Sequence, residues 1–222
     1  MHTVTLISYT PGADSGLLTA QLVECYRDVF ADGPWHEWLR CPQCDSYWGK
    51  KDGALLVSWQ FKHCGVPLVD YWPRERVLDD ICREITRDAR CTLAVSSDQV
   101  VGFCWGYPIR IPDLEAKVGI GVAKEIEESF GTQAHVGYQD EVGVLSQYRG
   151  AKIAHTMNKR RIQAFVAQGL QVIVSRARRT PSPSVTFKWY TEKLGYDVLV
   201  EYPPEDGRVI LGRPLAGLLE RY

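Results

Sequence analysis

Four residues in the first third of the chain combine soft metal ligands at close spacing. Cys41 and Cys44 form a Cys-x-x-Cys turn, and His63-Cys64 follows after eighteen intervening residues. Zn²⁺ prefers a tetrahedral set of thiolate and imidazole ligands, and one such turn supplies two of them. A metal would also organise residues 35–72, which hold five of the seven tryptophans but little periodicity. We therefore predict a structural zinc site with Cys41, Cys44, His63 and Cys64 as ligands.

The second half of this ligand set leaves alternatives open. Adjacent side chains diverge in extended backbone, so the fourth ligand could be His63, His36 or a residue outside the segment. Without metal, the segment would hold a reduced cysteine pair and tryptophans packed on the main domain. A redox role is a third possibility, although no thioredoxin-like βαβ pattern surrounds the cysteines. The tryptophans could also line a pocket for a bulky or cationic amine.

Residues 142–160 are the second stretch whose residue types and spacing could bind a ligand. A predicted strand runs into a short turn containing Gly150, and a helix follows at once. The free amides of a helix's first turn, with the helix dipole behind them, favour a phosphate group. Lys159, Arg160 and Arg161 lie further along this helix and could add positive charge. The pattern predicts an anion site, the alternative being an ordinary strand-to-helix turn.

Hydrophobic periodicity predicts the elements that position these groups. The expected strands are residues 4–9, 92–95, 100–107, 136–145, 171–174, 196–202 and 208–212. The expected helices are residues 18–30, capped by Asp14 or Ser15, 77–90, 113–130, 151–168 and a last helix capped by Ser182 or Ser184 and ending at Leu194-Gly195. This order predicts a mixed α/β (α+β) domain with a central sheet over residues 1–222, in which residues 35–72 are an insertion.

Composition excludes several classes of protein. The 222 residues are 45% hydrophobic and 24% charged, which is typical of a globular domain rather than a disordered chain. The net charge of −1 provides no global field for nucleic acid. We expect neither a membrane span nor a secretory signal, and hence a cytoplasmic protein whose seven cysteines are thiols or metal ligands.

Two motifs resemble those of the GNAT N-acetyltransferase superfamily. The first is its acetyl-CoA motif, Val-x-Pro-x-Tyr-Arg-Gly followed by Arg/Gln-x-x-Gly-x-Gly/Ala. Matching positions are Val144, Tyr148, Arg149, Gly150 and Ala154, whereas Ser146 replaces the usual proline and Lys152 the central glycine. The second is residues 187–196, which resemble the family's Leu-Tyr-Glu-Lys-Leu-Gly-Phe signature, with Pro183 and Thr186 in place of its upstream Asn and Ala. The resemblance implies a GNAT-type mixed sheet with helices on both faces.

The resemblance also implies roles for these residues in acetyl transfer from acetyl-CoA to a primary amine. Amides around Val144 and Leu145 would hold the thioester carbonyl. Tyr190 would be the general acid that protonates the coenzyme A thiolate, unless it is a packing aromatic. The pyrophosphate would be held by the amides of Arg149, Gly150, Ala151, Lys152, Ile153 and Ala154.

A general base for the amine would have to lie on the strand before the turn. Asp140 and Glu141 form an acidic pair there, with His135 further up the strand. Successive strand residues point to opposite faces, so at most one carboxylate faces the substrate without a bulge. The alternatives are that both carboxylates are solvated or balance arginines, and that a water relay replaces a dedicated base.

Two functions follow from these expectations. The first is an N-acetyltransferase that uses acetyl-CoA and acts on an amine of a small molecule, peptide or protein. The second is a degenerate GNAT fold that serves as a zinc-stabilised module for binding protein or nucleic acid. We expect no membrane partner and consider nucleic acid the less favoured partner, because the charge is balanced.

Overall fold

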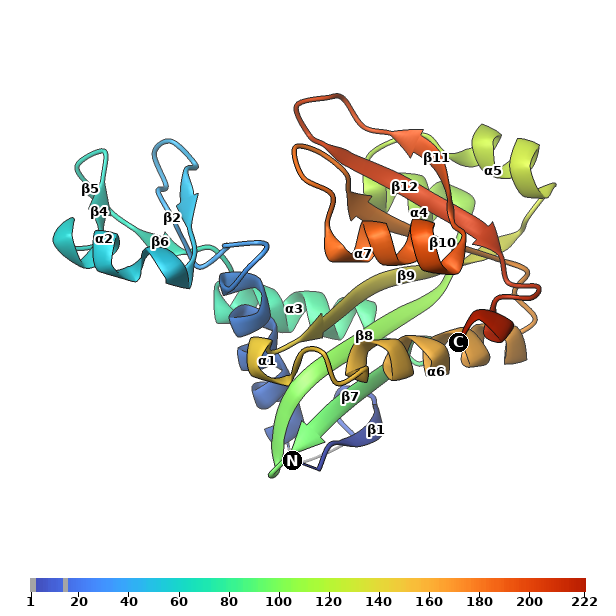
Figure 1. The fold of residues 1–222 in the computed structure, drawn as a ribbon, viewed down its shortest axis with the longest axis horizontal. Helices are drawn as coiled ribbons and strands as arrows, with labels where there is room; N and C mark the ends of the chain where they lie inside the picture. The colour runs from blue at the N-terminus through green and yellow to red at the C-terminus, as the bar shows by residue number, and fades with distance from the viewer. Residues whose placement is uncertain (1–2, 14–15) are drawn as a thin grey trace. The chain divides into compact units, whose positions relative to one another are not determined.

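The computed structural model describes residues 3–13 and 16–222 (Figure 1). The chain consists of two compact units. The first comprises Met1–Thr86, Thr92–Phe103 and Val142–Ala154, and the second comprises Arg87–Cys91, Cys104–Glu141 and His155–Tyr222. No helix within the described ranges has both the length and the apolar character needed to cross a membrane.

The main sheet confirms the prediction of a mixed α/β fold with a central sheet. Its strands are β1 (Thr5–Tyr9), β7 (Arg90–Ser96), β8 (Gln99–Arg110), β9 (His135–Val144), β10 (Val172–Arg178), β11 (Asp197–Glu201) and β12 (Arg208–Pro214). Among the described residues, these seven strands are ordered β1-β7-β8-β9-β10-β12-β11. Strands β9 and β10 are parallel, whereas β12 is antiparallel to both of its neighbours.

In the first unit, helices α1 (Leu17–Ala31) and α3 (Arg74–Glu84) pack against each other. The apolar side chains of α1 recur every three or four residues and are buried, including Leu22 and Tyr26. Tyr26 stacks on Phe103 of β8 with ring centroids 5.5 Å apart, which fixes α1 to the sheet. The caps expected for this helix, Asp14 and Ser15, lie outside the described residues.

Residues 35–72 form short elements rather than long periodic ones. Their bounds are β2 (Leu39–Arg40), β3 (Tyr47–Trp48), η1 (Lys50–Asp52), α2 (Gly53–Ser58), β4 (Lys62–His63), β5 (Val66–Pro67) and β6 (Val69–Asp70). Strands β3-β2-β6 form one small sheet, and β4-β5 form a hairpin. Arg27 of α1 anchors the end of the segment, donating from Nε to the carbonyl of Trp72 (2.8 Å) and from Nη2 to Asp70 (2.6 Å).

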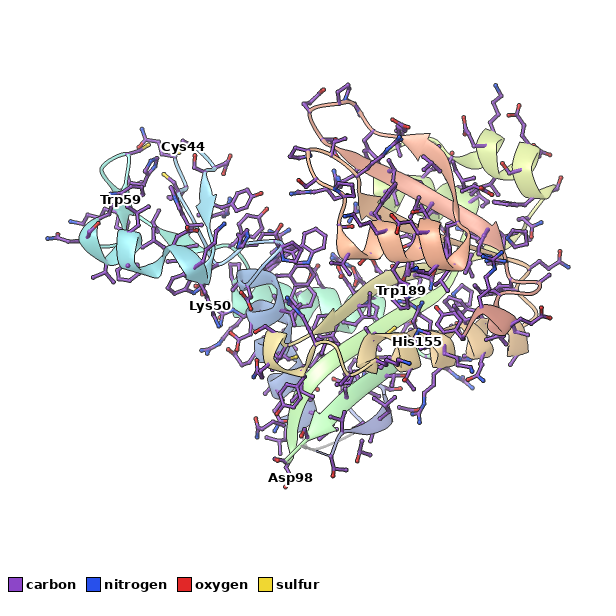
Figure 2. All side chains as sticks on the ribbon, in the orientation of Figure 1. Cys44, Lys50, Trp59, Asp98, His155 and Trp189 are labelled. Carbon is purple, nitrogen blue, oxygen red and sulfur yellow. The ribbon has the colours of Figure 1, made fainter. Side chains whose placement is uncertain are left out.

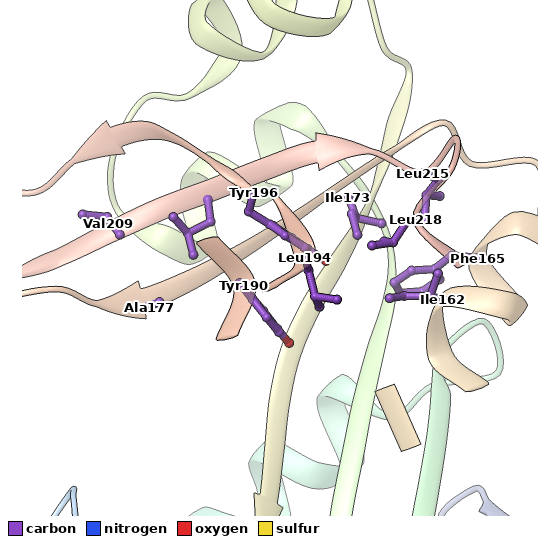
Figure 3. Packing of buried hydrophobic residues seen from close by; sticks show 11 residues of the cluster. Ile162, Phe165, Ile173, Ala177, Tyr190, Leu194, Tyr196, Val209, Leu215 and Leu218 are labelled. Carbon is purple, nitrogen blue, oxygen red and sulfur yellow. The ribbon is translucent and has the colours of Figure 1, made fainter. Parts of the chain in front are cut away.

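In the second unit, side chains of α6 (Ile153–Ala167), η3 (Trp189–Leu194), β10 and β12 form a hydrophobic cluster, and α7 (Val185–Lys188) packs against it (Figure 3). Residues of α4 (Ile111–Val118) and α5 (Ala123–Phe130) belong to a second buried cluster. The first cluster includes Phe165 of α6, Ile173 of β10 and Tyr190 of η3. Ser184 caps α7, because its hydroxyl accepts the amide N–H of Phe187 (3.0 Å).

The expectation of one helix over residues 113–130 is wrong. Gly119 adopts a left-handed conformation (φ 75°) and ends α4, with its amide donating to the carbonyl of Glu115 (2.8 Å). The Glu115 carboxylate then accepts the amides of Val122 (2.7 Å) and Ala123 (2.9 Å), which begin α5. A glycine in the left-handed region thus divides a stretch whose composition alone favours continuous helix.

Candidate active site

The predicted phosphate turn connects β9 to α6. Strand β9 ends at Val144, residues Ser146–Tyr148 form a 3-10 turn, and α6 begins at Ile153. Gly150 is left-handed (φ 84°), and a Cβ placed on it would meet no atom within 4 Å. The backbone here is therefore open to solvent and leads directly into the first turn of a helix. Such a turn can accept a pyrophosphate on its amides.

Lys152 adopts a left-handed backbone conformation, as Gly150 does. Its φ is 59°, in the left-handed region that costs a side chain with a Cβ about 1–2 kcal/mol. The amide of Lys152 remains a hydrogen-bond donor, since a lysine amide donates as a glycine amide does. The left-handed conformation lowers the stability of the fold, because it strains a residue that has a Cβ atom.

We expect Lys152→Gly to raise the free energy of unfolding by about 0.5–1 kcal/mol, the relief of strain exceeding the added chain entropy. Lys152→Ala keeps the Cβ and removes the rest of the side chain, so it serves as the control and should bring no gain. Chemical denaturation of the three proteins measures the difference. A Lys152→Gly protein less stable than Lys152→Ala would show that the left-handed backbone of residue 152 does not lower the free energy of unfolding.

Arg149 has a structural role in the turn. Its Nε donates to the carbonyl of Val144 (2.9 Å), and its Nη1 donates to the carbonyl of Gly33 (2.7 Å). Its own amide donates to the carbonyl of Ser146 (3.2 Å) within the 3-10 turn. The side chain therefore ties the turn to the end of β9 and to the loop after α1. A phosphate-binding role falls on the amides that follow it, from Gly150 to Ala154.

The two amides expected to hold a thioester carbonyl differ in their surroundings. The amide of Leu145 donates to the carbonyl of Val101 on β8 (3.0 Å). Because successive amides of a strand point to opposite edges, the amide of Val144 is directed away from β8. Pairing of β9 with β10 extends from Gly137 to Gln139 and does not reach Val144. The geometry thus favours Val144 over Leu145 as an oxyanion donor.

Asp140 is held in a buried ion pair. Its carboxylate accepts the Tyr107 hydroxyl (2.7 Å) and lies 3.0 Å from Lys117 Nζ, and its side chain is only 5% exposed. The partner of Asp140 is thus a lysine, whereas the alternative drawn from the sequence named arginines. Glu141 is partly exposed, and its backbone carbonyl accepts Nη1 of Arg161 (3.0 Å). His135 is exposed at the start of β9.

Tyr190 lies in the buried cluster of the second unit, with its hydroxyl oxygen at the cluster's edge (Figure 3). Its side chain is 1% exposed, and its ring stacks on that of Tyr196 at 4.7 Å. The hydroxyl accepts a hydrogen bond from Nη2 of Arg161 (3.0 Å). Burial raises the pKa of Tyr190 to about 12, against the opposing effect of Arg161. The phenol is therefore protonated at neutral pH, as a general acid must be.

Arg161 is the residue whose role the sequence concealed. We expected it to add positive charge near a phosphate, but its side chain is 2% exposed. Its guanidinium donates to the carbonyls of Trp105 (2.5 Å) and Glu141 (3.0 Å), to Asn158 Oδ1 and to the Tyr190 hydroxyl. Lys159 and Arg160 beside it are more exposed. Only the helical phase, which brings residues 158, 161, 162 and 165 to the buried face, could have indicated this.

The cysteine segment brings all four predicted ligands together (Figure 2 labels Cys44). One ligand atom from each of Cys41, Cys44, His63 and Cys64 lies within 4.8 Å of the others. His63 Nδ1 is 3.5 Å from Cys44 Sγ and 3.2 Å from Cys64 Sγ. Three thiols and one imidazole fit the donor set of a structural zinc site.

Two hairpin turns explain how adjacent residues can share this centre. Cys64 and Gly65 connect β4 to β5 with φ of 50° and 77°, as in a type I′ turn. The backbone at Cys64 is therefore not extended, and the divergence expected for neighbouring side chains does not occur. Cys41 and Cys44 lie in the β2–β3 loop, closed by the amide of Cys41 on the carbonyl of Ser46 (2.8 Å).

The four ligands differ in their environments. Cys41 is buried, His63 is partly buried, and Cys44 and Cys64 are exposed. Hydrogen bonding with the side chain and backbone of Ser46 lowers the pKa of Cys44 to about 6, so that this sulfur favours the thiolate that a metal requires. The ring of His63 lies 4.9 Å from that of Trp48 and 5.7 Å from that of Trp59. His36 is outside the group, with a buried Nδ1.

No protein-family model matches the sequence. No curated protein matches it. Among solved structures, the PaiA N-acetyltransferase of Thermoplasma acidophilum, in complex with coenzyme A, is similar with a TM-score of 0.53 and 13% identity, over 96% of this chain and 99% of that one. The mosquito protein 'arylalkylamine N-acetyltransferase like 5b' has a TM-score of 0.54 and 12% identity, over 96% of this chain and 100% of that one.

A third similar structure is described as an acetyltransferase of the GNAT family from Desulfovibrio desulfuricans. It has a TM-score of 0.51 and 10% identity, over 96% of this chain and all of that one. These matches span almost the whole of each chain. The protein therefore has the GNAT acetyltransferase fold, which confirms the fold expected from the two motifs. Identities this low establish the fold alone.

Proposed function

We propose that this protein is an N-acetyltransferase that transfers an acetyl group from acetyl-CoA to a primary amine. The observation that carries the proposal is the turn between β9 and α6. Its open, left-handed backbone at Gly150 and Lys152 leads into the N-terminus of a 15-residue helix, on a GNAT fold. The donors are backbone amides, which suit a pyrophosphate regardless of side-chain identity.

The chain's own residues would divide the chemical work. Acetyl-CoA, when bound, supplies the acetyl group as an activated thioester. The amides from Gly150 to Ala154 would bind its pyrophosphate, and the amide of Val144 would orient the thioester carbonyl and stabilise the oxyanion that forms on it. The Tyr190 hydroxyl would give its proton to the leaving thiolate.

Deprotonation of the amine needs a base or a water molecule. The side chain of Asp140 is only 5% exposed, so Asp140 is the less accessible candidate of the acidic pair. Glu141 is partly exposed at the end of the same strand and is the carboxylate that we propose for this role. Its position next to Asp140 places the two side chains on opposite faces of β9.

Isothermal titration calorimetry with acetyl-CoA tests the proposal directly. We expect saturable binding with a dissociation constant in the micromolar range, followed by release of free thiol when a panel of primary amines is added. Absence of binding at millimolar acetyl-CoA would refute the enzyme assignment. It would favour the degenerate fold acting as a binding module.

Tyr190→Phe should lower the turnover number about 100-fold, the usual contribution of a general acid, while changing the acetyl-CoA dissociation constant less than about twofold. Tyr196→Phe is the matched control, because Tyr196 is equally buried but its hydroxyl donates to Gln139 Oε1 (2.5 Å). Steady-state kinetics of thiol release compare the two variants. Equal turnover in wild type and Tyr190→Phe would remove Tyr190 from the mechanism.

We further infer that Cys41, Cys44, His63 and Cys64 bind Zn²⁺ in a structural role. A metal there would hold together residues 35–72, an insertion within one acetyltransferase domain that spans residues 1–222. The buried Cys41 and the two hairpin turns support this inference, since the ligand geometry is formed by the backbone itself. In this site all four positions come from protein, which suits a structural rather than a catalytic metal.

One observation favours the binding-module alternative. Several large apolar side chains of this segment are more than a third exposed, namely Tyr47, Leu55, Val57, Trp59, Phe61 and Val69 (Figure 2 labels Trp59). Exposed apolar patches often mark protein partners. The segment could therefore bind a protein whether or not the rest of the chain transfers acetyl groups.

A further inference from the structure

Arg161 carries a charge that no described group neutralises. It is buried on α6, and in residues 3–13 and 16–222 no carboxylate lies within ion-pair distance of it. Its N–H groups are satisfied by two carbonyls, by Asn158 Oδ1 and by the Tyr190 hydroxyl. These acceptors complete its hydrogen bonds but leave its positive charge uncompensated. A buried cation without a counter-ion is unfavourable, which calls for an explanation in function.

The groups around the Tyr190 hydroxyl are otherwise neutral. Tyr196 stacks against the Tyr190 ring, and Cys104 of β8 is a fully buried thiol. Tyr222 packs against the hydrophobic cluster that contains Tyr190. Burial raises the pKa of Cys104, which keeps that thiol protonated. Among the described residues, Arg161 is thus the one charged group in hydrogen-bond contact with this hydroxyl.

We propose that Arg161 is a positioning residue for acetyl transfer, serving as the counter-ion of the phenolate that forms on Tyr190. The inference rests on the proposed function. When the tetrahedral intermediate collapses, the carbon–sulfur bond breaks and its electron pair leaves with sulfur. The Tyr190 O–H bond then breaks, and its proton joins that sulfur to give a thiol. The phenolate that remains faces a cation already in place, and it regains, through water, the proton that the amine nitrogen has given to Glu141.

The energetic logic is that of a preorganised site. Before the transfer, Arg161 donates to a neutral hydroxyl, and its charge is uncompensated. After the transfer, the same hydrogen bond joins a cation to an anion and is stronger. The interaction is therefore better in the state that follows proton transfer, which is how a fixed charge speeds a reaction. Burial alone would instead oppose loss of the proton.

Three variants isolate the charge of Arg161. Arg161→Gln removes it, and Arg161→Lys retains it as the conservative rescue. Asn158→Asp leaves Arg161 in place but supplies a carboxylate, because Asn158 Oδ1 already accepts Nε (3.2 Å) and Nη2 (2.5 Å) of that guanidinium. Asn158→Asp retains every hydrogen-bond acceptor of the Arg161 guanidinium, so the proposal can be tested with it even if Arg161→Gln does not fold.

The readout is the ionisation of Tyr190 in the coenzyme-free protein. All tyrosines are replaced biosynthetically by 3,5-difluorotyrosine, which ionises at lower pH, and Tyr190→Phe identifies the Tyr190 fluorine resonance. We expect the titration midpoint to rise by at least about one pH unit in Arg161→Gln and Asn158→Asp, and to stay near the wild-type value in Arg161→Lys. An unchanged midpoint in folded Asn158→Asp would overturn the proposal, as would equal shifts in Arg161→Lys and Arg161→Gln.

This titration needs no substrate, so its failure leaves the acetyltransferase proposal standing. Conversely, failure to bind acetyl-CoA refutes the enzyme assignment without affecting the titration. In an active enzyme, Asn158→Asp should also lower kcat about 10-fold near neutral pH and leave KM for acetyl-CoA unchanged. A fall in kcat without a shifted midpoint would assign Arg161 a structural role only.

Discussion

Cys41→Ser is expected to abolish tight zinc binding by the protein, which we expect to hold one Zn²⁺ per chain in its wild-type form. Serine replaces a thiolate with a weak neutral ligand, and Cys41 is the buried member of the group. We expect at least a 100-fold loss of affinity, which corresponds to about 2.8 kcal/mol. Competition with a chromophoric chelator measures the affinity.

The loss of metal should also loosen residues 35–72. Trp48 and Trp59 lie beside the ring of His63, so their fluorescence should change on zinc release. Cys82→Ser is the control, because Cys82 is exposed on α3 and is not part of the metal group. A wild-type protein that takes up no zinc after reconstitution, or a Cys41→Ser protein that binds it as tightly, would contradict the site.

Ala154→Asp should weaken acetyl-CoA binding about 100-fold, or about 2.8 kcal/mol. Ala154 is the second residue of α6, so the new carboxylate lies among the amides proposed to hold the pyrophosphate. Like charges a few ångströms apart repel by several kcal/mol near a protein surface. The same carboxylate interacts favourably with the helix dipole, so the fold should be retained or slightly stabilised.

Gln163→Glu is the matched control for Ala154→Asp. It makes the same change of charge at an exposed position of α6, away from the first turn. Calorimetry should find wild-type affinity in this variant and stable folding in both. Equal affinities in Ala154→Asp and wild type would show that the helix N-terminus does not bind the coenzyme.

The sequence alone predicted an element correctly where a local pattern of residues is compatible with only one kind of structure. Period-two and period-three-to-four runs predicted the strands of the main sheet and helices α1 and α6. The glycine and small residues between Val144 and Ala154 predicted the turn, and the spacing of Cys41 and Cys44 predicted their shared loop. In each case the determining interactions lie between residues close in the chain.

Positive backbone angles were invisible in the sequence wherever the residue was not glycine. Lys152 and Cys64 both occupy the left-handed region. This conformation decides the shape of the turn between β9 and α6 and the convergence of His63 with Cys64. Sequence propensity argues against such conformations. They exist because the surrounding hairpin or helix fixes the chain on either side and compensates the local strain.

The identity of the groups that touch Tyr190 was decided by tertiary structure. The sequence determined that this protein has a mixed α/β core of GNAT type, a helix preceded by a short glycine-containing turn, and four soft ligands in two pairs. The tertiary structure alone determined which groups surround the buried Arg161 and that Asp140 forms an ion pair with Lys117. A charged side chain is buried or solvated according to which distant segments pack around it. The helical phase of α6 can indicate that residue 161 faces the core, but it does not indicate which distant groups accept its hydrogen bonds.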